Sequence, residues 1–228
     1  RMSRVKEITS YSALTCLQQS IMNLGILAVQ GLVNSFGTTV MAAFAAAVKI
    51  DAFAYLPVQD FGNAFSIFTA QNYGAKQTKR IQKGIRIAVL TSMVFSLFVS
   101  ICVFIFAKPL MTLFIDAEQT AVIAEGVRYL HIEGAFYFLI GALFLLYGLY
   151  RALGKPGMSV VLTIVSLGIR VALAYALSAI PVLGVVGIWW SVPIGWFLAD
   201  AFGIIYYFVK RKILLKGSGE DGSLAADQ

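Results

Sequence analysis

Residues 41–75 read MAAFAAAVKIDAFAYLPVQDFGNAFSIFTAQNYGA, a long apolar stretch rich in Ala and Phe around which the chain is organised. It is longer than the roughly 20 apolar residues that cross a bilayer as a helix, so we expect a tilted or protruding span. Three charged residues interrupt it: Lys49, Asp51 and Asp60. Because a charge in the middle of a span costs roughly 2.5–3.5 kcal/mol, such side chains are tolerated where they face the protein interior or a water-filled cavity. We therefore predict that this helix lines a pathway through the membrane.

The composition excludes an ordinary soluble domain. Hydrophobic residues make up 59% of the 228-residue chain and charged residues 13%, which is typical of a multi-pass membrane protein. The net charge of +7 arises from short basic clusters between apolar blocks, so it indicates membrane topology and not binding to nucleic acid. Cys16 and Cys102 lie in apolar blocks without a Cys/His cluster. We therefore expect no disulfide, no metal site and no cofactor.

The order of apolar blocks predicts an all-α integral membrane protein. We expect one domain over residues 1–212 with six transmembrane helices, at about residues 11–33, 40–72, 85–106, 127–150, 158–180 and 188–209. The Gly/Ser-rich acidic tail, residues 213–228, is expected to be disordered and cytoplasmic. Basic residues gather at the N-terminus and at alternate connections, so the positive-inside rule places both termini in the cytoplasm. The expected location is the cell membrane, plasma or inner.

Polar side chains in other spans extend the candidate pathway. Gln19 and Asn23 lie near one face of the first span, which suits either helix–helix hydrogen bonding or a cavity wall. Tyr55 on the second span, and Glu133 and Tyr137 on the fourth, complete the candidate set.

Depth along the spans suggests two cross-helix ion pairs, since a helix rises by roughly 1.5 Å per residue. Lys49 lies at a depth similar to that of Glu133, and Arg170 at a depth similar to that of Asp200. The last two spans are joined by a short loop and are therefore neighbours. We predict that Arg170 and Asp200 form a structural ion pair.

We favour a functional role for the charges of the second span. Lys49, Asp51 and Asp60, together with Pro57, exceed what a single partner helix can balance. Either acid of this helix is a candidate proton carrier.

Several short motifs resemble the C-terminal half of the multidrug and toxic compound extrusion (MATE) family. The sequence ALTCLQQ at residues 13–19 looks like the opening of that family's seventh helix. Lys49-Ile50-Asp51 and QNYGA at residues 71–75 look like landmarks of the eighth helix. RALGKP at residues 151–156 is similar to the Arg-Gly-x-Gly-Asp turn after the tenth helix. The resemblance covers about residues 1–212.

The resemblance implies one lobe of a two-lobe, 6+6 transporter, with a cavity between the lobes lined here by the first, second and fourth spans. Family members export drugs or other cationic and amphiphilic compounds in exchange for protons or sodium ions, by alternating access. The implied partners are the lipid bilayer, a small-molecule substrate, a proton or sodium ion, and the N-terminal lobe or a second copy. Some members carry an acid on the seventh and tenth helices, and the matching positions here are Asn23 and Ile140. This departure argues against a cation site of that type.

Two alternatives stay open: a lipid-linked oligosaccharide flippase of the same superfamily, and a membrane assembly subunit without transport activity. A flippase would need more cationic residues in its cavity, where only Lys49 offers itself. A membrane enzyme is disfavoured, because the sequence has no HExxH motif, acidic metal cluster, phosphate loop or Ser-His-Asp arrangement. We predict that the chain is not an enzyme.

Overall fold

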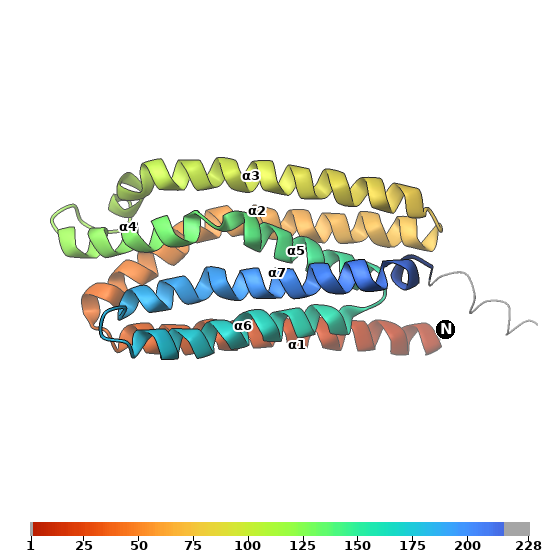
Figure 1. Cartoon of the computed structure of the whole chain (residues 1–228), viewed down its shortest axis with the longest axis horizontal. Coiled ribbons are helices and arrows are strands. Elements are labelled where there is room, and N and C mark those ends of the chain that lie inside the picture. Colours follow the sequence, from red (N-terminus) through yellow and green to blue (C-terminus); the bar gives the residue numbers. More distant parts are fainter. Residues whose placement is uncertain (1, 217–228) are drawn as a thin grey trace, which may run out of the picture.

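The computed structural model describes residues 2–216, which form helices joined by short connections and contain no strand. The helices are α1 (Met2–Asn34), α2 (Thr38–Gly74), α3 (Thr78–Thr112), α4 (Thr120–Gly134), α5 (Tyr137–Ala152), α6 (Pro156–Ser178) and α7 (Val185–Lys216). Figure 1 shows the long helices lying side by side, with the start of α1 and the end of α7 at the same end of the bundle. We call this the terminal end, and the opposite one the distal end.

Five helices, α1, α2, α3, α6 and α7, contain a stretch long and apolar enough to cross a membrane. The pair α4 and α5 is together long and apolar enough for a sixth span, and the two helices meet at a bend of 52°. The predicted all-α lobe is confirmed, with five spans, or six if α4 and α5 cross the membrane together. The single span expected at about residues 127–150 is divided between these two helices. The break follows Gly134, a poor helix former, and Phe136 donates its amide to the carbonyl of Glu133 at 2.9 Å in a tight turn.

The ends of the spans also differ from the prediction. Helix α7 continues to Lys216, so residues 213–216 of the predicted disordered tail are helical. Residues 217–228, the rest of that tail, lie outside the described residues. Between α3 and α4 the connection is the loop at residues 113–119, because α3 runs on through Pro109 to Thr112.

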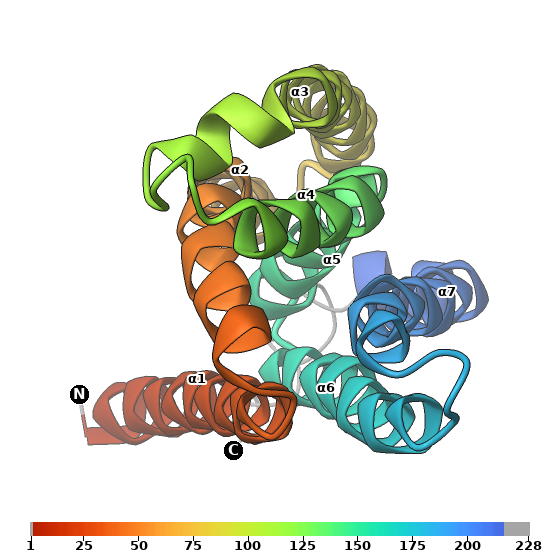
Figure 2. The ribbon, with the colours of Figure 1, turned by 90° about the vertical axis from the view of Figure 1, so that its left-hand side faces the viewer.

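Helices α2 and α5 pack closely at the centre of the lobe (Figure 2). A Cβ atom placed on Gly148 would lie 2.5 Å from the carbonyl oxygen of Gly62, so only glycine fits this contact. Small residues of this kind let helix backbones approach in a membrane, where dispersion contacts supply much of the attraction. This contact fixes α5 against α2 next to the candidate site.

Candidate functional site

A cavity of about 330 Å³ lies inside the lobe, with walls formed mainly by α1, α2, α4, α5 and α6. Its wall includes six of the eight predicted pathway residues: Gln19, Asn23, Asp51, Tyr55, Glu133 and Tyr137. Their transport role stays a prediction, but the fold brings them to one place.

Asp51 is the centre of this site. Its side chain is only 5% exposed, and its Oδ2 accepts a hydrogen bond of 2.6 Å from the hydroxyl of Tyr129. The hydroxyl of Tyr137 donates to Oδ1. Tyr129 belongs to α4 and Tyr137 begins α5, so a single carboxyl group joins the two helices across the 52° bend.

Glu133 and Arg170 complete the charged groups of the site. Glu133 lies one helical turn after Tyr129, is 3% exposed, and lines the same cavity as Asp51. Arg170, from α6, lines the same cavity and acts on both acids through its charge. Glu133 Oε1 and Arg170 Nε are both buried and form no hydrogen bond with the described part of the chain. The site therefore has free hydrogen-bonding capacity beside two acids and one guanidinium group.

Lys49 and Asp60 do not line this cavity, so their predicted place in the pathway stays a prediction. Both side chains are exposed. Lys49 is two residues before Asp51, which turns it by about 200° to another face of the helix. Its Nζ lies 5.6 Å from the centre of the Phe114 ring, a cation–π contact, so the expected pairing with Glu133 does not form.

The predicted ion pair between Arg170 and Asp200 is wrong. Arg170 faces the cavity of Asp51, whereas Asp200 lines a different cavity on the other side of α5. Neither carboxyl oxygen of Asp200 accepts a hydrogen bond from the described residues. Equal depth on adjacent helices is not enough to form an ion pair here, because the side chains of Arg170 and Asp200 point in different directions.

A smaller polar cavity of about 120 Å³ adjoins the first toward the terminal end, since both are lined by Gln19, Gln59 and Tyr147. Arg151 also lines it and donates from Nη2 to Asn63 Oδ1 at 2.9 Å, linking α5 to α2. The site of Asp51 therefore continues into polar surroundings on the side of the chain termini.

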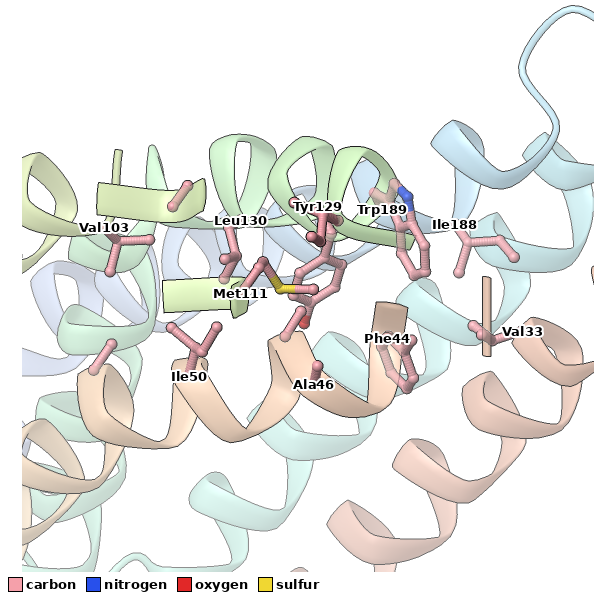
Figure 3. Packing of buried hydrophobic residues seen from close by; sticks show 14 of the residues in the cluster. Val33, Phe44, Ala46, Ile50, Val103, Met111, Tyr129, Leu130, Ile188 and Trp189 are labelled. Atoms are coloured by element: carbon pink, nitrogen blue, oxygen red, sulfur yellow. The ribbon is translucent and has the colours of Figure 1, made fainter. Parts of the chain in front are cut away.

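Toward the distal end, aromatic rings close the site (Figure 3). Phe44 stacks on Trp189 with 5.6 Å between ring centres, and Tyr129 meets both rings edge-on. Trp189 Nε1 donates to Glu125 Oε1 at 2.8 Å, which ties α7 to α4. In Figure 3 the hydroxyl oxygen of Tyr129 points toward α2, where Asp51 lies. The cavity is thus blocked by a packed aromatic cluster on one side and adjoins polar groups on the other.

Sequence reasoning missed Tyr129, Arg151 and Arg170 as members of the site. Tyr129 could have been found, because it lies four residues before Glu133 and eight before Tyr137, on the same helical face. Arg170 was recognised as an intramembrane charge, but its partner could not be chosen from depth alone. Arg151 was interpreted only as part of the turn motif at residues 151–156, which gives no sign of its contact with α2.

Comparison with known proteins identifies the family. The MatE family profile matches residues 15–176, more than half of the chain. The chain belongs to the MATE family. Its members are transporters, which confirms the prediction that the chain is not an enzyme. Membership together with the apolar helices establishes a multi-pass membrane protein.

Two curated relatives from Bacillus subtilis (strain 168) are similar over 84% of the chain. The probable multidrug resistance protein YpnP is 29% identical over 193 residues, and the probable multidrug resistance protein YoeA is 27% identical over 194 residues. The match covers 42% of each relative. The chain thus spans less than half the length of these relatives.

Solved MATE structures share the fold at low sequence identity. The structure of MATE in complex with MaL6 matches 95% of the chain and 49% of its own length, with a TM-score of 0.88 and 20% identity. An outward-facing multidrug resistance MATE transporter matches 90% of the chain and 46% of its own, at 21% identity. An inward-facing multidrug resistance MATE transporter matches 90% of the chain and 48% of its own length, at 20% identity. The TM-score is 0.82 for both.

Proposed function

We propose that the chain is the C-terminal six-helix lobe of a two-lobe MATE antiporter. It would export drugs or other cationic and amphiphilic compounds in exchange for protons or sodium ions. The observation that carries this proposal is Asp51, a buried carboxyl that joins α4 to α5 across a bend and lies beside Glu133 and Arg170. The near half-length match to whole MATE proteins supports a second lobe as partner.

The charge balance of the site supports coupling to one monovalent cation. With both acids ionised, Asp51, Glu133 and Arg170 carry a net charge of −1. A single proton or sodium ion neutralises that charge, which lowers the cost of holding the site inside a membrane. Glu133 Oε1, buried and without a donor from the described residues, offers an acceptor for it.

The hydrogen bonds of Asp51 connect binding of the cation to the contact between α4 and α5. As a carboxylate, Asp51 accepts one hydroxyl on each oxygen, from Tyr129 and from Tyr137. A proton on either oxygen turns that oxygen into a donor, so the tyrosine bound to it must rotate its hydroxyl or leave. Occupancy of the site would thereby change how α4 and α5 are held across the bend.

The exposed faces of the lobe support a position for the missing lobe. Exposed polar residues lie within the spans of α1 and α2: Gln19, Asn23, Lys49 and Asp60. The exposed residues in the middle of α3 and α7 are largely apolar, such as Leu90 and Ile205 at 65% and 62% exposure. Charges avoid lipid. We infer that α1 and α2 face the other lobe and its water-filled cleft, and that α3 and α7 face the bilayer.

The lobe is proposed to move as a unit during transport. Its fold matches the outward-facing and the inward-facing structures with the same TM-score of 0.82. That similarity fits rocking of two intact lobes around a central site. With both termini in the cytoplasm, as the basic clusters predict, the polar cavity near Arg151 would lie on the cytoplasmic side of the cell membrane.

A lipid-linked oligosaccharide flippase is less well supported. Its substrate carries phosphate groups, which call for an excess of cationic side chains in the cavity. The cavity of Asp51 has two acids and one arginine, and Lys49 lies outside it. A passive assembly subunit would gain nothing from keeping these buried charges, which are costly in a membrane.

The coupling is tested in vesicles that contain the full-length protein and a fluorescent organic cation. A proton gradient and a sodium gradient are imposed separately at equal membrane potential. We expect one gradient to drive accumulation of the cation. Equal transport with neither gradient, or transport of a lipid-linked oligosaccharide alone, contradicts the proposal.

A further inference from the structure

A second cavity of about 330 Å³ lies on the other side of α5 from Asp51, with walls from α2, α3, α5 and α7. Its wall is built almost wholly of apolar side chains, among them Phe65, Val89, Leu145 and Phe197. The two cavities have no lining residue in common, although α2 and α5 contribute side chains to both. Neither the family membership nor the site of Asp51 accounts for it.

One acid interrupts this apolar wall. Asp200 is 3% exposed, and its Oδ1 and Oδ2 are both buried without a hydrogen-bond donor in the described part of the chain. Ser92 lines the same cavity, and its hydroxyl is likewise buried without a partner. A buried carboxyl group normally has partners, because burying an unpaired polar group costs free energy. Asp200 therefore lacks the partner that its burial requires.

The position of Asp200 narrows the chemistry of that partner. Asp200 lies near the middle of α7, 15 residues after Val185 and 16 before Lys216, so it is roughly 22–24 Å from either end of the helix. Polar lipid headgroups lie at the membrane surface, far from this depth. The partner must therefore be a group that enters the hydrocarbon region on an apolar body.

The surroundings show from which side such a molecule comes. Figure 2 shows α3 and α7 on either side of α5, away from α1. Exposed side chains next to the cavity are large and apolar on both helices, such as Leu90 and Ile204. The cavity thus lies beside the faces that we assign to lipid.

We propose that this cavity is a second binding site, which takes a lipophilic amine from the bilayer. Both carboxyl oxygens of Asp200 are covered by neighbouring atoms, so the side chain rotates toward the cavity when the ammonium group pairs with it. The hydrocarbon body fills the space between α3, α5 and α7. A cavity of about 330 Å³ is at the lower end of the range for small-molecule sites, roughly 300–1,000 Å³. The inference rests on Asp200, on its cavity and on the proposed contact of α3 and α7 with lipid, and it does not rest on the coupling role of Asp51.

Photolabelling of the full-length protein in lipid nanodiscs tests the site. The probe is a dodecylamine with a diazirine on its chain, and the matched neutral probe is the corresponding alcohol. At neutral pH we expect the amine to label peptides around Val89 and Phe197. Asp200→Asn should lower that labelling by about tenfold or more, because one partner of a buried charge pair is removed. Labelling by the alcohol should be weak and the same in both proteins.

Two further variants make the result decisive. Ala142→Phe keeps the acid but fills the cavity, and it should abolish labelling by the amine even if Asp200→Asn folds poorly. Asp51→Asn should leave the labelling unchanged, so failure of this proposal is separate from failure of the coupling proposal. Equal labelling by amine and alcohol, or equal labelling of the wild type and a folded Asp200→Asn variant, overturns the amine site. Loss of labelling in Asp51→Asn alone assigns the amine to the first cavity and also overturns it.

Discussion

The hydroxyl of Tyr129 donates a hydrogen bond of 2.6 Å to Oδ2 of Asp51, 78 residues earlier in the chain and on another helix. Tyr137 makes the matching bond to Oδ1 from beyond the bend. The shape of the broken span is thus tied to one carboxyl group on α2.

Replacement of Tyr137 by Phe should loosen the bend between α4 and α5. The variant removes one donor to a buried carboxyl, a bond to a charged group worth about 1.5–3 kcal/mol. Spin labels at the exposed positions Arg128 and Lys155 report the distance between the two arms by pulsed electron resonance. We expect a broader distance distribution than in the wild type.

The control for this experiment is the same substitution in an Asp51→Asn background. If the hydroxyl of Tyr137 acts through Asp51, its removal should add little further broadening there. A narrow distribution in Tyr137→Phe itself would show that helix packing alone sets the bend.

Trp189 should hold the distal wall closed. Trp189→Ala removes both the stacking on Phe44 and the hydrogen bond to Glu125, whereas Trp189→Phe removes only the second. We expect a cysteine placed at Val33, which is fully buried, to react with a membrane-impermeant maleimide fastest in the Ala variant. The Phe variant should lie between it and the wild type.

That assay needs a protein in which Cys16 and Cys102 have been replaced. Identical reaction rates in all three proteins would contradict the assignment of this cluster as the distal closure.

Gly148→Ala should destabilise the lobe. The added Cβ would meet the carbonyl oxygen of Gly62 at 2.5 Å, so α5 must move away from α2. We expect a lower melting temperature of the purified protein in detergent. Gly168→Ala is the matched control, since its Cβ meets nothing within 4 Å, and alanine should there be neutral or favourable for the helix. Equal melting temperatures for the two variants would count against close α2–α5 packing.

Much of the fold could be predicted from the sequence, because long apolar runs separated by Lys, Gly and Pro leave few alternatives in a membrane. The charge of Asp51 within an apolar helix predicted a place in the pathway, and Asp51 lines the cavity. The same reasoning could not tell that Lys49 and Asp60 are exposed, because the three charges point in different directions around the helix and the sequence does not show which direction faces the other helices. The bend at Gly134 was also hidden, because glycine is common within transmembrane helices and a single glycine does not mark a break. Arg170 and Asp200 do not pair although their depths are similar, because their side chains point into different cavities.

Labelling of the helix faces tests where the second lobe lies. In the full-length protein, cysteines at Lys49 and Asp60 should react with a polar maleimide, because these positions face the proposed cleft. Leu90 and Ile205 are also exposed in this lobe, but cysteines there should resist the maleimide, because lipid covers them. The opposite order of reactivity would place the partner lobe against α3 and α7.

The transport rate of Asp51→Asn in vesicles, compared with wild type and with Asp116→Asn, shows whether Asp51 couples the ion gradient to export. Asp116 is an exposed acid in the loop after α3, so its replacement is the matched control. We predict that Asp51→Asn lowers gradient-driven export by about 10–100-fold, as expected for about 1.5–3 kcal/mol of lost interaction. Exchange of substrate without a gradient should persist, and Asp116→Asn should match the wild type. Gradient-driven export by Asp51→Asn at the wild-type rate and equal expression would contradict the account.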